Sequence, residues 1–238
     1  MFPVTITSSH NEKLKEIRKL RARRRERERD DRFVAEGEDL LDAADAAGWE
    51  PVERLCAAGS GLPGDPVLPE LLAEVSGLGS GVRTLAVYEA RWAAHPVGPL
   101  CVYLHGVRDP GNVGAILRSA EAFGGSCVAV GPKTADPYGP KAVRASMGAI
   151  FNVPVVRLDD ASQLPGQTVA LDAAAEAQLA DLALEDEVSL LVGAERDGLP
   201  PELVAGADHA ARIPIATHSL NAAMAATVAL YELRRITR

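Results

Sequence analysis

The sequence predicts an α/β protein made of two consecutive units, a smaller one over residues 1–95 and a larger one over residues 96–238. Strand-like and helix-like segments alternate along most of the chain, as they do in α/β folds. Several strand-like runs of the larger unit are continuously apolar, which is typical of a parallel sheet covered on both faces. Residues 93–99 contain two prolines and a glycine and suit a linker between the units.

A helix is expected near the start of the smaller unit. Ser9 and Glu12 have the spacing of a capping box, and Leu14, Ile17 and Leu20 follow at intervals of three residues as a narrow apolar stripe. The rest of this unit is expected to form strands over residues 32–35, 52–57 and 83–87, a helix over residues 39–47 ended by Gly48, and a loop rich in glycine and proline over residues 59–69.

The larger unit is expected to carry six strands and three helices. In the first helix Asn112 is the expected cap, and in the last helix Ser219 is the expected cap with Asn221 as the second helical position. The strands are expected over residues 100–105, 126–131, 153–157, 168–172, 188–193 and 209–214, and the helices over residues 113–123, 141–147 and 219–235.

The composition narrows the class of protein. Hydrophobic residues make up 47% of the chain and charged residues 24%, which excludes a largely disordered protein. The apolar run over residues 222–231 is too short to span a bilayer, and no secretory leader is expected at the N-terminus. Three cysteines lie far apart without paired spacing, which favours a reducing compartment, here the cytoplasm, and predicts no disulfide and no metal site.

The charge is distributed unevenly along the chain. The net charge is −8, but residues 1–35 hold eleven Lys and Arg against six Asp and Glu, so this segment is positive by five charges. An anionic partner responds to such a local patch rather than to the total charge. Arg23, Arg24 and Arg25 are therefore candidate phosphate contacts. The alternative is a solvated helix face on which nearby arginines and acids, such as Glu26 and Glu28, form local pairs.

The first segment that could take part in binding or catalysis spans residues 105–124. A strand ends, a Pro-Gly turn follows, and Asn112 precedes a helix, so polar groups lie at the carboxyl edge of the expected sheet, the usual ligand crevice. Neither the G-x-G-x-x-G nucleotide fingerprint nor a Walker-type phosphate loop is present. Arg118 lies six residues after Asn112 and not simply on the same helix face. The simpler interpretation is a capped helix with an outward-pointing arginine.

Two further segments follow apolar strands. Gly193 ends one strand just before Glu195 and would let a ligand approach the backbone, although, taken alone, the segment is explained more simply as a tight turn with exposed charges. The other segment contains Ser219 and Asn221 shortly after a strand that ends at Pro214. Ser219 has a simple explanation as a cap, whereas the Asn221 amide can both donate and accept hydrogen bonds at a helix start.

Taken together, these segments resemble the three motifs of the SpoU (TrmH-like) RNA 2′-O-ribose methyltransferases of the SPOUT superfamily. The matching patterns are Asn-x-Gly-Ala-Ile-x-Arg from residue 112, Gly-x-Glu-x-x-Gly-Leu from residue 193, and Ile-Pro-Ile followed by Ser-Leu-Asn and a helix ending in Leu-Tyr-Glu. The resemblance covers the chain from about residue 100 onward. The basic helix and the stretch Phe-Val-Ala-Glu-Gly from residue 33 resemble the substrate-binding extension of the family.

The resemblance implies a fold, a cofactor and an assembly. The implied fold is an α/β domain whose C-terminal segment is threaded into a deep trefoil knot. S-adenosylmethionine is the implied cofactor, with Gly193, Ile213 and Leu220 lining its adenosyl pocket, and no metal is required. Members act as homodimers through their knot helices, and the alanine-rich residues 222–229 would permit close helix contact.

The resemblance also implies roles in the attack of a ribose 2′-hydroxyl on a sulfonium methyl group. Arg118 is the central catalytic residue, and because a guanidinium stays protonated, a role as an electrostatic clamp is more plausible chemically than a role as a base. Asn112 would orient that arginine or the ribose. Glu195, Ser219 and Asn221 would position the substrate or the cofactor.

The separate N-terminal unit favours ribosomal RNA over tRNA as the substrate. Two alternatives stay open: a tRNA 2′-O-methyltransferase, and an RNA-binding protein that keeps the fold without catalysis. A nicotinamide-dependent oxidoreductase is excluded by the missing glycine fingerprint.

Overall fold

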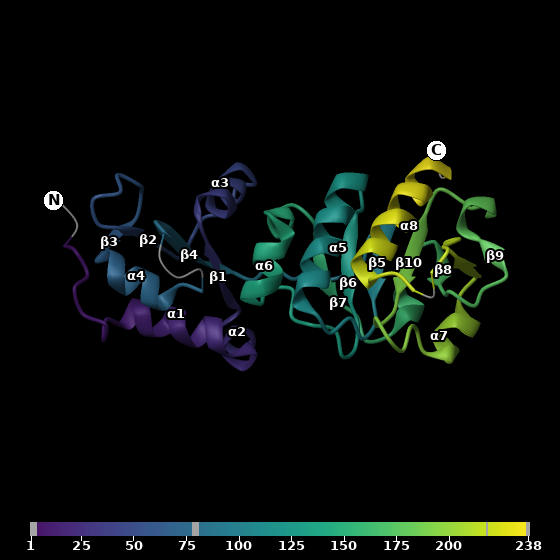
Figure 1. Ribbon diagram of the computed structural model, residues 1–238, viewed down its shortest axis with the longest axis horizontal. Helices are drawn as coiled ribbons and strands as arrows, with labels where there is room; N and C mark the ends of the chain where they lie inside the picture. The colour runs from purple at the N-terminus through teal and green to yellow at the C-terminus, as the bar shows by residue number, and fades with distance from the viewer. Residues whose placement is uncertain (1–3, 78–80, 218, 237–238) are drawn as a thin grey trace.

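The computed structural model describes residues 4–77, 81–217 and 219–236 and contains two α/β units that lie side by side (Figure 1). The N-terminal unit is built on a four-stranded sheet of order β1-β4-β2-β3. In this sheet β4 pairs antiparallel with β1 and β2, and β2 pairs parallel with β3. Its elements are α1 (Glu12–Ala22), α2 (Arg24–Asp30), β1 (Arg32–Glu36), α3 (Glu38–Ala46), β2 (Glu53–Ala57), β3 (Asp65–Val67), α4 (Pro69–Val75) and β4 (Thr84–Glu89).

Three features of the N-terminal unit differ from the prediction. Asn11, not Ser9, caps α1, because its side chain accepts a hydrogen bond from the Lys13 N–H at 3.0 Å. The backbone of Arg23 is extended and separates α1 from α2. The stretch expected as a loop contains β3 and ends at the first residue of α4, Pro69, where the missing N–H of proline costs nothing.

The C-terminal unit is built on a seven-stranded sheet of order β7-β6-β5-β10-β8-β11-β9, in which every pairing is parallel. All six predicted strands are present, and the short strand β9 and helix α7 were not predicted. The elements are β5 (Leu100–Leu104), α5 (Pro110–Phe123), β6 (Cys127–Val130), α6 (Pro140–Ser146), η1 (Ala149–Phe151), β7 (Val155–Arg157), η2 (Ala161–Gln163), β8 (Gln167–Leu171), β9 (Ala177–Gln178), η3 (Leu179–Asp181), β10 (Val188–Val192), α7 (Pro201–Gly206), β11 (His209–Arg212) and α8 (Ala222–Ile236).

Two helix starts differ from the prediction. Helix α5 begins at Pro110 and is capped by Asp109, whose side chain accepts a hydrogen bond from the Gly111 N–H at 2.6 Å. Asn112 is therefore the third residue of the helix, and its side chain is not used as a cap. Helix α8 begins at Ala222, and Asn221, not Ser219, accepts hydrogen bonds from the first backbone N–H groups.

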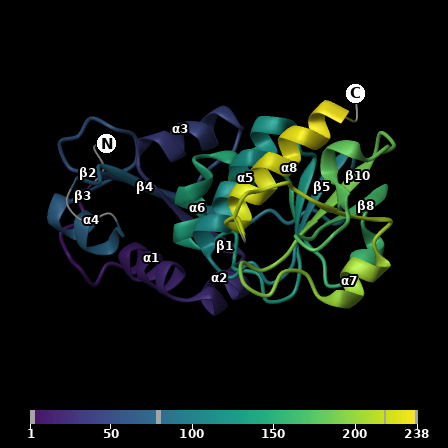
Figure 2. The same ribbon diagram turned by 45° about the vertical axis from the view of Figure 1, so that its right-hand side comes forward.

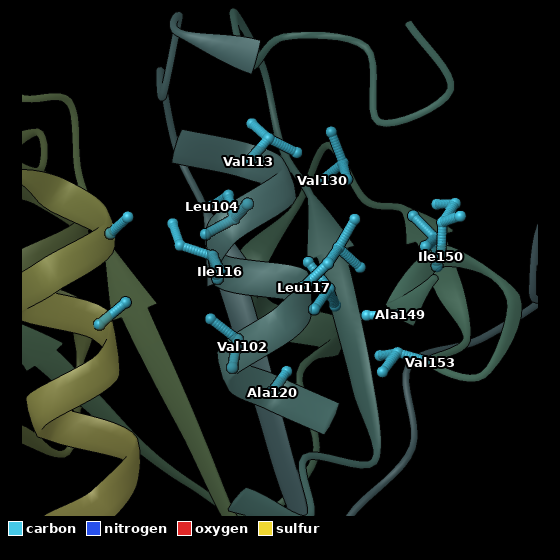
Figure 3. Packing of buried hydrophobic residues seen from close by; sticks show 14 of the residues in the cluster. Val102, Leu104, Val113, Ile116, Leu117, Ala120, Val130, Ala149, Ile150 and Val153 are labelled. Atoms are coloured by element: carbon cyan, nitrogen blue, oxygen red, sulfur yellow. The ribbon is translucent and has the colours of Figure 1, made fainter. Parts of the chain in front are cut away.

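One face of the parallel sheet packs against α5 and α8, which lie alongside each other (Figures 1 and 2). Figure 3 shows Val113, Ile116 and Leu117 of α5 among apolar side chains of β5, β6 and η1. Helix α6 approaches α5 at Gly114, where an added Cβ would lie 2.3 Å from the Ala142 carbonyl oxygen. The glycine of the first motif is thus required by helix packing.

One hydrophobic cluster spans both units. Phe33 of β1 stacks near Tyr138 with ring centroids 4.8 Å apart, and Trp49 meets Phe151 at 5.2 Å. The indole of Trp49 also donates a hydrogen bond to the Phe151 carbonyl at 2.8 Å. The continuous aromatic packing fixes the N-terminal unit against the C-terminal one. Over the described ranges, no helix is long and apolar enough to cross a membrane.

Candidate active site

The carboxyl ends of the parallel strands meet at a cavity of about 330 Å³. The loops after β8, β10 and β11 and the start of α8 form its walls. All three residues predicted to line a cofactor pocket, Gly193, Ile213 and Leu220, lie on it together with Glu195 and Ser219. The other lining residues are Leu171, Asp172, Ala173, Val192, Ala194, Arg196, Asp197, Gly198, Ile215, Ala222 and Ala225.

Gly193 is required by the turn that follows β10. A Cβ at this position would lie 2.2 Å from the Gly198 carbonyl carbon. Ala194 and Gly198 exchange backbone hydrogen bonds of 3.1 and 3.0 Å, and Gly198 has a left-handed φ of 65°. The absence of a side chain at Gly193 is thus explained by close packing of the chain on itself, the simpler of the two explanations, while the residue still lines the cavity.

Three polar side chains form a hydrogen-bonded chain beside the cavity. The Oδ1 atom of Asn221 accepts the Ala223 N–H at 2.9 Å, so its Nδ2 atom faces Asn112 and donates to Asn112 Oδ1 at 3.0 Å. The Nδ2 atom of Asn112 in turn donates to Glu195 Oε1 at 2.6 Å. Because the cap fixes one end, the donor and acceptor direction of the whole chain is determined. The structure therefore brings three of the five predicted catalytic residues together.

The other two predicted catalytic residues are placed differently. Ser219 is exposed, lines the cavity and takes no part in the chain of side-chain hydrogen bonds. Arg118 lies on the exposed side of α5, outside the residues that line the cavity, and it has no hydrogen bond or ion pair with any residue that the structure describes. Within the described ranges Arg118 is thus an unpaired cation, and the Asn112 amide contacts Asn221 and Glu195 instead.

Asp109 and Lys141 form a pair at the start of α5 that the sequence reasoning missed. The Lys141 ammonium lies 3.0 Å from both carboxylate oxygens of Asp109. The hydrogen bond from Lys141, followed by the one from the Gly111 N–H, lowers the pKa of Asp109. An aspartate directly before a proline and a helix was the available signal, because aspartate is favoured as a cap and proline at the first helical position.

The basic N-terminal segment is only partly free. Arg23 and Arg25 are exposed and have no ion pair within the described ranges. Arg24 donates to Glu28 at 2.8 Å, four residues further along α2, which is the local pairing that the sequence left open as the alternative to phosphate contact. Arg27 is buried and pairs with Asp136 of the C-terminal unit at 2.7 Å.

Cysteines and potential metal ligands do not form a site in the described part of the chain. Cys56, Cys101 and Cys127 are buried and free, and no group of three or more His, Cys, Asp or Glu side chains is placed to hold a metal ion there.

Comparison with known proteins identifies the family. The model of the SpoU rRNA Methylase family matches residues 99–231, and that of the MRM3-like substrate binding domain matches residues 11–89. The chain belongs to the SpoU rRNA methylase family. The α/β fold with its parallel sheet also matches solved structures of methyltransferases over both units.

Two solved structures are similar over nearly the whole SpoU chain. One is an AdoMet-bound rRNA methyltransferase from Sinorhizobium meliloti, with a TM-score of 0.85 at 30% identity, covering 98% of this chain and 97% of the other. The second is the SpoU methyltransferase AviRb from Streptomyces viridochromogenes in complex with AdoMet, with a TM-score of 0.84 at 28% identity, covering 95% and 98%.

Relatives with stated activities include two 23S rRNA 2′-O-methyltransferases. The guanosine(2553) enzyme RlmP of Bacillus subtilis is 27% identical over 96% of this SpoU chain and 98% of its own length. The uridine(2479) enzyme of Streptomyces viridochromogenes is 36% identical, but the match spans 53% of this chain and about half, 49%, of that relative.

Proposed function

We propose that this protein transfers a methyl group from S-adenosylmethionine to a ribose 2′-hydroxyl of ribosomal RNA. The observation that carries the proposal is the hydrogen-bonded chain from Asn221 through Asn112 to Glu195 at the edge of a cavity formed by three strand ends. The similarity to rRNA 2′-O-methyltransferases over nearly the full chain supports it.

Ribosomal RNA is favoured over tRNA because the N-terminal unit is part of the similarity. The RlmP relative covers both units, and the substrate-binding model matches residues 11–89. By contrast, a structure described for the 2-OH methylation of C/U34 on tRNA covers 58% of this chain, with a TM-score of 0.53.

The residues of the cavity fit S-adenosylmethionine. A volume of about 330 Å³ lies at the lower end of the range of about 300–1,000 Å³ for ligand pockets. Ile213, Ile215 and Leu220 offer apolar surface for an adenine ring, and the carboxylates of Asp172 and Glu195 suit a cationic sulfonium. When bound, S-adenosylmethionine supplies an electrophilic methyl group.

The side chains of the protein orient the acceptor hydroxyl and stabilise its developing charge. The Oε1 atom of Glu195 accepts a hydrogen bond from the Asn112 amide, which leaves Oε2 to accept a hydrogen bond from the ribose. Asn221 keeps Asn112, and through it Glu195, in one orientation. Arg118 remains protonated and supplies an electrostatic contact to the RNA phosphate or the developing alkoxide. Positioning of this kind supplies much of the rate enhancement in a reaction that needs no metal.

Several finer properties belong to the same proposal. The C-terminal segment is threaded as a trefoil knot, as the resemblance to SPOUT enzymes implies. The boundary between the substrate-binding and methyltransferase domains lies at residues 95–96, a position supported by the gap between the two family matches. The protein acts in the cytoplasm. Its three free cysteines are compatible with this reducing compartment, and so is an rRNA substrate.

The protein also acts as a homodimer in this proposal. Support comes from the outer side of α8, where Met224, Val228 and Tyr231 are 63%, 43% and 57% exposed at helical spacing. Four alanines of the stretch over residues 222–229, at positions 222, 223, 226 and 229, are buried inside the same chain and leave little surface for a second copy. The contact is instead made by the larger exposed side chains.

The decisive experiment maps 2′-O-methyl sites in total RNA from cells with and without the protein. We expect one rRNA site to disappear without the protein and to return with the wild-type protein but not with N112A. Loss of a tRNA site would transfer the assignment to tRNA. An unchanged methylation map would favour the non-catalytic RNA-binding protein.

A further inference from the structure

We propose that Lys133, Arg108 and Arg196 form a phosphate track that leads a single RNA strand across the carboxyl edge of the parallel sheet to the active site. These residues follow β6, β5 and β10, which are consecutive neighbours in the sheet. Neighbouring strands lie about 4.8 Å apart, so the cations come from successive positions along one edge. This inference rests on the proposed function, since it assigns the RNA path at the same site.

The three side chains are available to an anion. Each is exposed, and none has an ion pair within the part of the chain that the structure describes. Two other cations of the C-terminal unit are already paired: Lys141 with Asp109 and Arg144 with Glu36. The unpaired cations can therefore contact RNA phosphates without first breaking an ion pair. Each such contact releases counterions that were condensed on the RNA.

One end of the track reaches the active site. Arg108 and Arg196 line the same small cavity, of about 240 Å³, together with Ala194, Glu195 and Asp197. Glu195 is the carboxylate that accepts the Asn112 amide, so an RNA phosphate bound here would lie beside the catalytic chain. The carboxylates of Glu195 and Asp197 oppose an anion in this cavity, and for that reason both guanidiniums are needed to attract a phosphate.

The other end of the track reaches the basic N-terminal segment. Lys133 is followed by Thr134, whose carbonyl accepts a hydrogen bond from Arg24 at 3.5 Å, and by Asp136, which pairs with Arg27. His105 directly follows β5, and burial lowers its pKa. The positive charge of nearby Lys133 lowers the His105 pKa further. The track thus connects helix α2 with the loop after β5.

The arrangement favours a single strand over a duplex. The cations form one row, which follows one sugar-phosphate backbone, whereas a duplex presents two. Proteins that select one RNA nucleotide usually act on unpaired segments, where the ribose and base can be turned toward a site. In a single strand, the ribose that carries the acceptor hydroxyl can be turned in this way to enter beside Glu195.

The test measures how binding depends on salt. The probe is a fluorescent 20-nucleotide oligouridylate, and the variants are the double R108Q/K133Q and the triple R108Q/K133Q/R196Q. Each lost phosphate contact reduces the slope of log affinity against log salt by about 0.7 on a single strand, so we expect reductions of about 1.4 and about 2.

A matched triple variant controls for total charge. K15Q/R29Q/R235Q removes three exposed cations that already pair with Glu12, with Glu26 and Asp30, and with Glu232. We expect its slope to stay within about 0.5 of the wild type, because its cations make no phosphate contacts. Equal changes in both triple variants, or none in the track variant, would overturn the track. A larger change on a 20-base-pair RNA duplex would overturn its single-strand character.

A second readout separates the track from the proposed function. R108Q/K133Q removes no residue that lines the cofactor cavity, so calorimetry should find unchanged S-adenosylmethionine affinity. On rRNA extracted from cells lacking the protein, this variant should show a several-fold higher KM and a kcat within two-fold of the wild type. A wild-type protein that binds oligouridylate through the track but methylates no rRNA would refute the proposed function alone.

Discussion

Asn221 and Asn112 are 109 residues apart in sequence and are joined by a hydrogen bond of 3.0 Å at the starts of two packed helices. The backbone N–H groups of α8 fix the Asn221 amide, and Asn221 fixes Asn112. The last link, from Asn112 to Glu195, makes the position of the carboxylate depend on a helix cap.

Replacing Asn112 by alanine should therefore lower the rate of methyl transfer. The variant loses the donor to Glu195 and the acceptor of Asn221, and a misplacement of this kind costs about 10²-fold in rate. Single-turnover methylation of unmodified rRNA, with S-adenosylmethionine at saturating concentration, measures the effect.

Asn152 provides the matched control for this prediction. Its Nδ2 atom donates to Glu121 Oε1 at 2.6 Å, the same contact at the same distance, on the surface away from the cavity. N152A should keep the wild-type rate. Equal losses in N112A and N152A would mean that the loss reflects general destabilisation.

Replacing Arg118 by alanine should abolish methyl transfer and leave cofactor affinity unchanged. Arg118 is exposed, lies outside the cofactor cavity and has no partner in the described ranges, so the fold does not depend on its charge. R118K should fail as well, because an ammonium lacks the planar fork that grips a phosphate. Methylation assays paired with calorimetry give both quantities, and a wild-type rate in either variant would remove Arg118 from the mechanism.

The sequence predicted the central strands well for a physical reason. Strands buried on both faces, such as β5 and β10, are continuous apolar runs, and these are visible without any tertiary contact. Strand β9 has two residues and gives no such pattern, and α4 begins at Pro69 within a stretch that otherwise indicates a loop.

The candidate site was predicted as a set of residues but not as an arrangement. Motif spacing identified Asn112, Glu195 and Asn221, yet the two contacts that connect them span 83 and 109 residues. Local chemistry cannot reveal such contacts. The same holds for the shared aromatic core, since nothing near Trp49 in sequence indicates that it packs on Phe151.

The structure reduces the effect expected from R23A/R24A/R25A. Arg24 already pairs with Glu28, and only Arg23 and Arg25 are free of ion pairs in the described ranges. Two phosphate contacts on a single strand correspond to a reduction of about 1.4 in the salt slope, below the two to three units that three free arginines would give. Anisotropy titrations over a range of salt concentrations measure the slope. An unchanged slope would exclude this segment from RNA binding.

Replacing Arg27 by methionine should destabilise the fold by about 3–5 kcal/mol, because Asp136 would remain buried without its partner. Urea unfolding measures the free energy. Arg29 is the control, since its pairs with Glu26 and Asp30 involve an exposed guanidinium, and R29M should change stability far less than R27M does. Replacing Arg27 and Asp136 together with apolar residues should recover part of the loss; no recovery would contradict the electrostatic explanation.

Charging the outer side of α8 should convert a dimer into a monomer. In M224E/V228E, two carboxylates replace exposed apolar side chains, and burying them against a second copy would be unfavourable without partners. Sedimentation velocity should show half the wild-type mass, with circular dichroism unchanged because both positions face solvent within one chain. The control is L62E, at a position outside α8 in the N-terminal unit, which should stay dimeric. A wild-type protein that sediments as a monomer, or a variant that remains dimeric, would exclude this side of α8 as the dimer contact.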